Sequence, residues 1–228
     1  MADQLFTLRL RERQLLRMRA LHNLEKPFAS LLKSKRYETR ADIRDEFVRM
    51  MNQQGEPCDL LEFGVFKGES MQTWVSSMTH ADMRFYGFDS FRGLPEDWAG
   101  KMIKGTFATG GQLPDIQDER LTFIPGWIQN TLPGFLQTYD NGRKKRIFVH
   151  NDVDLYSATL FILSALWFHF DEIVVLYDEF GVDENLAMYD FMSAFPIKFT
   201  FHGYAFQGQE KHLPQKVLCT IRKTELVV

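Results

Sequence analysis

Seven short apolar runs recur along the chain after residue 57, and most of them alternate with stretches of helical periodicity. Between the first two runs, Met71, Trp74, Val75 and Met78 stand at positions i, i+3, i+4 and i+7, which is one face of an amphipathic helix. Helical spacing recurs within residues 160–167 after the fourth run and within residues 186–192 after the fifth. Such alternation predicts a parallel sheet with helices on both faces. The runs, each predicted to be a strand, cover residues 58–63, 84–88, 121–124, 146–150, 173–177, 197–206 and 216–222.

The last two runs are connected differently from the others. Only nine residues separate residue 206 from residue 216, which is too few for a parallel crossover of roughly a dozen residues or more. The seventh strand should therefore run antiparallel. We predict an α/β fold with a seven-stranded, doubly wound, Rossmann-like sheet whose seventh strand is antiparallel.

A helical region precedes the first run. Residues 5–24 contain neither Gly nor Pro and are predicted to form a helix, and residues 42–53 place apolar residues on one helical face. We therefore expect an N-terminal helical layer, with a helical arm at residues 1–54 and the sheet domain at residues 55–228.

Composition places the chain among ordinary globular proteins. Hydrophobic residues make up 45% of the 228 residues and charged residues 25%. No apolar run approaches the roughly 20 residues of a membrane span, and the first residues carry charges where a signal peptide has its apolar stretch. We expect a cytoplasmic protein with no membrane partner. Cys58 and Cys219 lie in apolar runs and are expected to be reduced core thiols.

Charge is distributed unevenly. The first 50 residues hold 12 Lys and Arg against 7 Asp and Glu, a net charge of +5, so the remainder carries −8 of the total of −3. The basic residues are interspersed with Leu at helical intervals and lack a stripe of aromatic residues, which argues against nucleic acid as a partner. The alternatives are a solvated helix face and an arm that packs on a partner subunit, which would make the protein a homodimer or higher homo-oligomer.

The stretch LLEFGVFKGES joins the first predicted strand to the first helix of the sheet. Glu62 ends the strand, Gly64 and Gly68 follow, and the helix begins near Ser70. Glycines in such a turn let a ligand approach the backbone at the carboxyl edge of the sheet. A dinucleotide fingerprint has glycine where this chain has Glu62, whose carboxylate would repel a pyrophosphate. The pattern favours a positively charged cofactor without phosphate, such as S-adenosylmethionine, although tight-turn glycines with no ligand would also account for it.

An acidic residue ends the second strand. Asp89, in the stretch FYGFDSFRGLP, follows Gly64 by 25 positions. An acidic residue at this place typically accepts hydrogen bonds from ribose hydroxyls. The alternative is that Asp89 caps a turn with Ser90. The two sites together favour a cofactor that contains adenosine.

Four carboxylates follow the fourth and fifth strands. Asp152 and Asp154 end the stretch IFVHNDVD, and Asp178 and Glu179 follow the next strand. Because these strands should be neighbours, Asp152 should lie near Asp178 and Glu179. Uncompensated carboxylates would repel one another, and a hard divalent cation removes this repulsion. With no His or Cys cluster, the predicted ion is Mg²⁺, with Mn²⁺ or Ca²⁺ as alternatives.

Residues 150–154 also include candidates for proton transfer. Asp152 could accept the proton of a metal-bound acceptor hydroxyl. Asp154 is expected to cap the following helix together with Ser157. His150, which precedes Asp152 on the strand, is either a hydrogen-bonded core residue or a catalytic base.

Several motifs in order resemble a known family. The stretches EFGVFKGES, YGFDSFRGLPEDW, GWIQNTLP and HNDVDLYSAT, followed by YDEF, are similar to those of the TylF-type (macrocin O-methyltransferase) family of class I S-adenosylmethionine-dependent methyltransferases. The resemblance covers roughly residues 58–195. It implies methyl transfer to a hydroxyl of a small molecule, often a sugar or phenolic natural product, with a divalent cation. The family often has an Asp-Asp pair where this chain has Asp178 and Glu179.

The resemblance also implies roles for single residues. Asp89 and Ser90 would contact the ribose of the cofactor, and Trp127 would lie near its adenine. The residues that would line the methionine end are Glu62, Gly64, Gly68 and Ser70.

The sequence leaves three possible functions. The first is an S-adenosylmethionine-dependent O-methyltransferase with Asp152 and His150 as candidate catalytic residues. The second is a protein that binds the cofactor without catalysis, because the Asp-Glu change has abolished the metal site. The third is a nicotinamide-dependent oxidoreductase, which Glu62 argues against.

Overall fold

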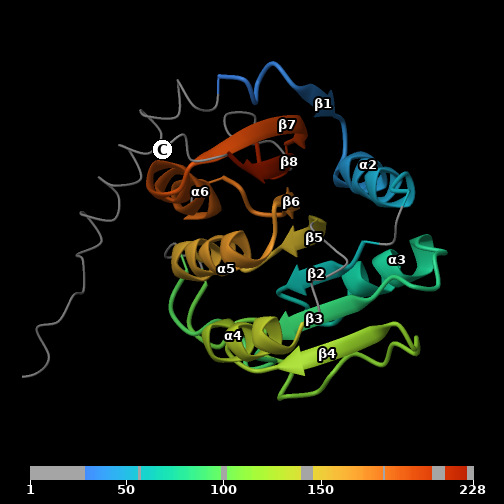
Figure 1. Cartoon of the computed structure of the whole chain (residues 1–228). Coiled ribbons are helices and arrows are strands. Elements are labelled where there is room, and N and C mark those ends of the chain that lie inside the picture. The colour runs from blue at the N-terminus through green and yellow to red at the C-terminus, as the bar shows by residue number, and fades with distance from the viewer. Residues whose placement is uncertain are drawn as a thin grey trace, which may run out of the picture.

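A mixed sheet of eight strands forms the centre of the protein (Figure 1). The structure is a computed structural model that describes residues 29–55, 58–98, 102–139, 146–181, 183–206 and 214–224. The strands are β1 (Lys35–Tyr37), β2 (Leu60–Phe63), β3 (Phe85–Asp89), β4 (Leu121–Pro125), β5 (Arg146–Asn151), β6 (Glu172–Tyr177), β7 (Ile197–Ala205) and β8 (Lys216–Lys223). The helices are α2 (Arg40–Asn52), α3 (Glu69–Ser77), α4 (Ile128–Thr138), α5 (Tyr156–His169) and α6 (Asp183–Ala194).

The topology confirms the predicted fold class. The strand order is β1-β7-β8-β6-β5-β2-β3-β4. Within it, the five neighbouring strands β6, β5, β2, β3 and β4 pair in parallel. Strand β8, the seventh predicted strand, is antiparallel to both β6 and β7. All seven predicted strands occur, with ends within two residues of those expected.

The sheet has one more strand than the pattern predicted. Strand β1 pairs in parallel with β7 and extends the sheet at that edge. Its three residues, KRY, are too few to show an alternating pattern, so the sequence carried no signal for it.

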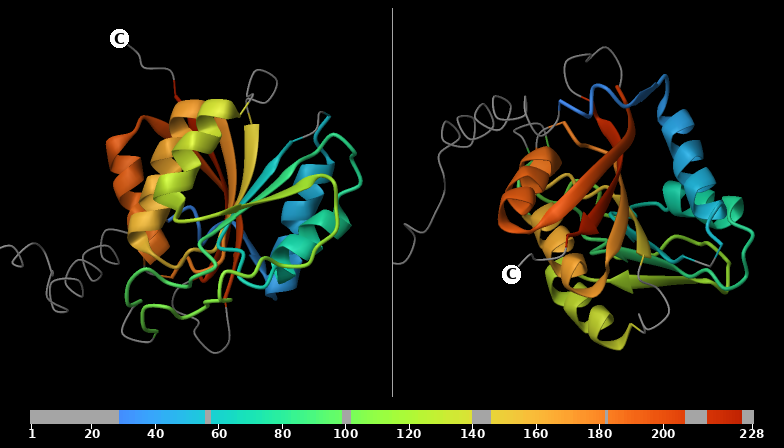
Figure 2. Two further views of the ribbon diagram at one scale, coloured as in Figure 1. Left: turned by 90° about the horizontal axis from the view of Figure 1, so that it is seen from below. Right: turned by 45° about the horizontal axis from the view of Figure 1, so that its top comes forward.

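Helices cover both faces of the sheet. Figure 2 shows α2 and α3 on one side and α4, α5 and α6 on the other. On the first side Phe47 of α2 packs edge-on against Trp74 of α3 and Phe148 of β5, with ring centroids 5.5 and 5.4 Å apart. The side chains of Phe47, Trp74 and Phe148 are fully buried. Helix α2 is therefore fixed against the sheet, and its N-terminal end is held near the carboxyl ends of β5 and β6.

A capping box begins α2. The Thr39 hydroxyl accepts from the Asp42 N–H at 3.1 Å, and the Asp42 carboxylate accepts from the Thr39 N–H at 2.8 Å. The predicted helix at residues 42–53 is confirmed as α2. The predicted helix at residues 5–24 lies outside the described residues.

Both cysteines are free and buried, as expected. Among the described residues, no helix combines the length and the apolar character needed to cross a membrane.

Candidate functional site

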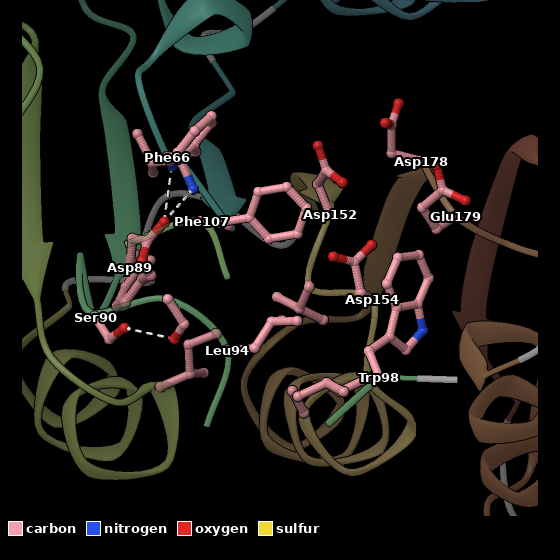
Figure 3. A pocket seen from close by; sticks show the side chains of 18 of the residues that line it. Phe66, Asp89, Ser90, Leu94, Trp98, Phe107, Asp152, Asp154, Asp178 and Glu179 are labelled. Carbon is pink, nitrogen blue, oxygen red and sulfur yellow. Dashed lines mark hydrogen bonds between the residues drawn. The ribbon is translucent and has the colours of Figure 1, made fainter. Parts of the chain in front are cut away.

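A cavity of about 430 Å³ lies at the carboxyl edge of the parallel strands (Figure 3). Its lining comes from the segments that follow β2, β3, β4, β5 and β6, together with α2. This is the edge at which doubly wound sheets bind ligands, and the volume is that of a small-molecule site. The cavity joins the two regions that the sequence singled out, the glycine turn with Asp89 and the carboxylates after β5 and β6.

The glycine turn brings β2 against β5. Gly64 has φ +86°, and a Cβ on this residue would overlap the carbonyl oxygen of Asp152. Glycine is therefore required at this position because the backbone of Asp152, after β5, lies against it. Gly64 also lines the cavity. Gly68 has φ +82° and packs against Pro114, outside the lining.

Glu62 lies beneath the cavity in a buried polar chain. Its Oε1 accepts a hydrogen bond from the Ser70 hydroxyl and lies 2.7 Å from His150 Nδ1. Glu62 and His150 are fully buried, and neither is part of the cavity lining, whereas Ser70 is. The structure thus connects three residues that the sequence named separately, with Ser70 as the member that reaches the cavity.

Asp89 holds the turns after β2 and β3 together. One carboxylate oxygen accepts from the N–H groups of Val65 at 2.9 Å and Phe66 at 2.8 Å, and the other accepts from the N–H of Phe91 at 2.7 Å. The turn-capping contact considered for Asp89 is therefore present. A carboxylate offers about four acceptor positions, so these three bonds leave capacity for a ligand. Asp89 and Ser90 both line the cavity.

The carboxylates after β5 and β6 converge as predicted. Asp152, Asp178 and His150 each offer one atom within 4.8 Å of the others, an arrangement that can hold a metal ion. Glu179 is outside this group, and its Oε1 lies 3.3 Å from the ammonium nitrogen of Lys216. From the sequence, the third predicted metal ligand beside Asp152 and Asp178 was Glu179 and not His150.

Three basic side chains compensate these carboxylates. Lys216 of β8 is almost fully buried, and its Nζ lies 3.0 Å from Asp178 Oδ2. Arg40 of α2 lies 2.7 Å from the same oxygen and 3.8 Å from Asp152. Arg44, one helical turn later, lies 3.8 Å from Asp178 Oδ1. None of the three was expected from the sequence. The predicted helix began at residue 42, whereas α2 begins at Arg40 and so places Arg40 and Arg44 on one face.

The protonation of the cluster follows from burial and these neighbours. Burial and the charge of Asp178 raise the pKa of Asp152 to about 7. Burial opposes the charged form of Asp178 too, but His150, Lys216 and Arg40 hold its pKa well below the ordinary value. Burial lowers the pKa of His150, yet Asp178 and Glu62 outweigh it and raise this pKa to about 9. Asp152 is thus the member of the cluster whose pKa suits proton exchange near neutral pH.

The expectation for Asp154 was wrong. Helix α5 has Leu155 as its N-cap residue, with no side-chain capping bond. Asp154 has φ +63° and turns its carboxyl group into the cavity instead, beside those of Asp152 and Glu179 (Figure 3). Burial, followed by the charge of Asp152, raises its pKa to about 8. Left-handed backbone at a non-glycine residue often marks a functional site.

An apolar wall faces the carboxylates. It comes from the long connection after β3 and includes Leu94, Trp98 and Phe107 (Figure 3). The Trp98 indole N–H donates to Asp183 of α6 at 3.1 Å, which ties the connection to the far side of the cavity. Trp127, at the N-terminal end of α4, also lines the cavity. The arrangement offers carboxylates on one side and aromatic surface on the other, which suits a small molecule with hydroxyl groups.

No protein-family model matches the chain. Over 151 residues it is 28% identical to the 8-demethyl-8-(2,3-dimethoxy-alpha-L-rhamnosyl)-tetracenomycin-C 4'-O-methyltransferase of Streptomyces olivaceus. This alignment covers 56% of the chain and 54% of the relative, so the chain spans about half the length of the curated relative it matches.

Solved structures show a similar architecture. The O-methyltransferase NovP matches with a TM-score of 0.52 and 20% identity, covering 79% of each chain. The apo structure of CalS11, a TDP-rhamnose 3'-O-methyltransferase, matches with a TM-score of 0.48 and 18% identity, covering 92% of this chain and 93% of its own. The likeness to NovP shows that the two chains share a Rossmann-like fold.

Proposed function

We propose that the chain is an S-adenosylmethionine-dependent O-methyltransferase that methylates a hydroxyl group of a small molecule. The observation that carries this proposal is the continuous cavity that joins the glycine turn and Asp89 to the carboxylates Asp152 and Asp154. One end suits an adenosine-containing cofactor and the other end suits a hydroxyl acceptor. The motifs of the TylF-type family and the printed activity of the Streptomyces olivaceus relative support the same reaction, with a sugar or a phenolic natural product as acceptor.

The residues of the cavity suggest how the reaction would proceed. S-Adenosylmethionine, when bound, would supply a sulfonium methyl group open to attack by a nucleophilic oxygen, with S-adenosylhomocysteine as the leaving group. Asp152 would accept the proton that the acceptor hydroxyl loses, because its pKa of about 7 matches this task. Leu94, Trp98 and Phe107 would exclude water and hold the acceptor against the carboxylates.

A divalent cation is part of the proposal. His150 Nε2 is buried and has no hydrogen-bond partner among the described residues. Together with the carboxylates of Asp152 and Asp178 it would fit such an ion, and binding would displace the proton that the raised pKa of His150 favours. Its chemistry would be to lower the pKa of the acceptor hydroxyl. Arg40 and Lys216 already contact Asp178, so an ion would compete with them for this carboxylate. The carboxylate oxygens suit Mg²⁺, with Mn²⁺ or Ca²⁺ as alternatives.

Calorimetry tests this proposal. S-Adenosylhomocysteine should bind in both the presence and the absence of Mg²⁺, and NAD should not bind. A screen of sugars and phenols for methyl transfer would then identify the acceptor. Cofactor binding without transfer to any acceptor would favour a non-catalytic binding protein, and detectable NAD binding would favour an oxidoreductase.

Asp89→Ala is expected to weaken S-adenosylmethionine binding by about 1.5 to 3 kcal/mol, because the ribose diol would lose a charged acceptor. Calorimetry with S-adenosylhomocysteine measures the effect. Because Asp89 also binds the Val65 and Phe66 amides, a 2',3'-dideoxy analogue is the control. The loss should be smaller for this analogue, and equal losses would assign Asp89 to the turns alone.

The N-terminal arm is proposed to mediate self-association or to cover the active site. A truncation should stop at residue 28, because β1 and the start of α2 belong to the folded unit. We expect removal of residues 1–28 to change the oligomeric mass, measured by light scattering, or the affinity for the acceptor. Unchanged values together with a loss of RNA or DNA binding would contradict this prediction.

A further inference from the structure

The positive charge of the cavity lies on few residues. Among the lining residues that the structure describes, the basic ones are Arg40 and Arg44 of α2 and Lys67 of the glycine turn. The side chain of Arg44 is 19% exposed and that of Arg40 is 45% exposed. Lys67 is exposed and lies over the ring of Phe66 at 5.3 Å. Arg44 is thus the most deeply placed cation in the cavity wall.

Arg44 forms one ion pair with the described residues, a loose one with Asp178. Its Nε is buried and makes no hydrogen bond within the described part of the chain. The nearest carboxylate oxygen, Asp178 Oδ1, is 3.8 Å away, and the other oxygen of Asp178 already contacts Arg40 at 2.7 Å and Lys216 at 3.0 Å. A guanidinium whose Nε is buried without a hydrogen bond is costly to hold charged, and a bound anion would offset this cost. Because Arg44 lines the cavity, an anionic group of a ligand could supply that compensation.

Other contacts keep Arg44 in place. The guanidinium lies over the Trp74 indole, 5.7 Å from the ring centroid, and Trp74 is itself fully buried. A cation–π contact of this kind restrains the guanidinium beside the cavity. A fixed guanidinium edge matches a carboxylate through two parallel hydrogen bonds.

We propose that Arg44 binds the α-carboxylate of the methionine part of the cofactor. This inference rests on the proposed function. Asp89, Ser90 and Trp127 line the part of the cavity assigned to adenosine, whereas Arg44 lies against α3, the helix that begins at the glycine turn. Arg40 is engaged by Asp178 and Asp152, so it is the less suitable partner for the carboxylate.

A pair of ligands that differ only in this carboxylate tests the inference. Calorimetry would compare S-adenosylhomocysteine with its decarboxylated analogue on the full chain. The unmodified protein should bind S-adenosylhomocysteine roughly ten- to a hundredfold more tightly, the range for hydrogen bonds to a charged group. Arg44→Gln should remove this preference by weakening S-adenosylhomocysteine alone. Arg49→Gln, on the same helix but paired with Glu46 outside the cavity, should retain the preference.

The outcomes separate this inference from the proposed function. If the unmodified protein binds neither ligand, the proposed function fails and the inference fails with it. If it binds both ligands equally, or if Arg44→Gln weakens both equally, only the role of Arg44 is overturned. Equal binding of the two ligands by the unmodified protein would overturn the inference without any variant. If Arg44→Gln does not fold, Arg44→Lys replaces it and should reduce the preference, because it keeps the charge but not the planar pair of donors.

Discussion

Asp152→Asn is expected to lower the rate of methyl transfer by about two orders of magnitude or more. The substitution removes the proposed proton acceptor and one of the three groups that could hold a cation. Affinity for the cofactor should stay nearly unchanged, because the residues assigned to it lie on α2, at the end of β2 and after β2, β3 and β4, and Asp152 is not among them. Steady-state kinetics with an acceptor from the screen, together with calorimetry of S-adenosylhomocysteine, would measure the two effects separately.

Asp171→Asn provides the matched control for this substitution. Asp171 lies before β6 with a side chain that is 60% exposed, and it is not part of the cavity. Its substitution should leave the rate unchanged. A fully active Asp152→Asn variant would exclude Asp152 as the proton acceptor and would direct attention to Asp154.

A chelator tests the cation independently of the carboxylate. Methyl transfer by the unmodified protein should fall in the chelator to the level of Asp152→Asn, and added Mg²⁺ should restore it. Full activity in the chelator, combined with an inactive Asp152→Asn variant, would mean that the carboxylate acts without a metal and that Arg40 and Lys216 alone compensate Asp178.

Gly64→Ala is expected to destabilise the fold by about 2 to 5 kcal/mol. Roughly 1 to 2 kcal/mol comes from the left-handed backbone and about 1 to 3 kcal/mol from overpacking. The new methyl group would overlap the Asp152 carbonyl oxygen, so the turn after β2 and the end of β5 would have to separate. Urea unfolding monitored by circular dichroism measures the change in the free energy of unfolding.

Gly134→Ala is the matched control. Gly134 lies inside α4, does not have a positive φ, and has open space where a Cβ would be. The same substitution there should leave the stability unchanged or raise it by up to about 1 kcal/mol, because alanine favours the helix. Equal stability of the two variants would contradict the close approach of β2 and β5.

The local pattern predicted most of the elements, and its two omissions have physical causes. Strand β1 is too short to show a period. Helix α4 contains Pro133 followed by Gly134, two residues that interrupt a helical pattern in a sequence. In the structure α4 is nonetheless held by burial of Leu132 and Leu136 against the sheet. Packing here outweighs local preference.

For the candidate site, the residue types were easier to predict than their partners. Asp152 and Asp178 converge because both follow neighbouring parallel strands, and strand order could be inferred. Glu179 was expected to share the metal site. It lines the same cavity as Asp152 and Asp178, but its carboxylate pairs with Lys216 of β8 and is outside the group of three that could hold an ion. Asp154 was expected to cap α5, but its left-handed backbone turns the carboxyl group into the cavity.

By itself, the sequence determined the class of fold, the direction of β8 and the edge of the sheet where the chemistry would lie. These features follow from periodicity, connection length and strand ends, which are local properties of the chain. Only the tertiary structure decided which charges meet there. Arg40 and Arg44 come from α2 and Lys216 from β8, and they reach Asp178 because helix and strand pack at that edge. Ion pairs depend on distances between segments far apart in the sequence, and no local pattern encodes those distances.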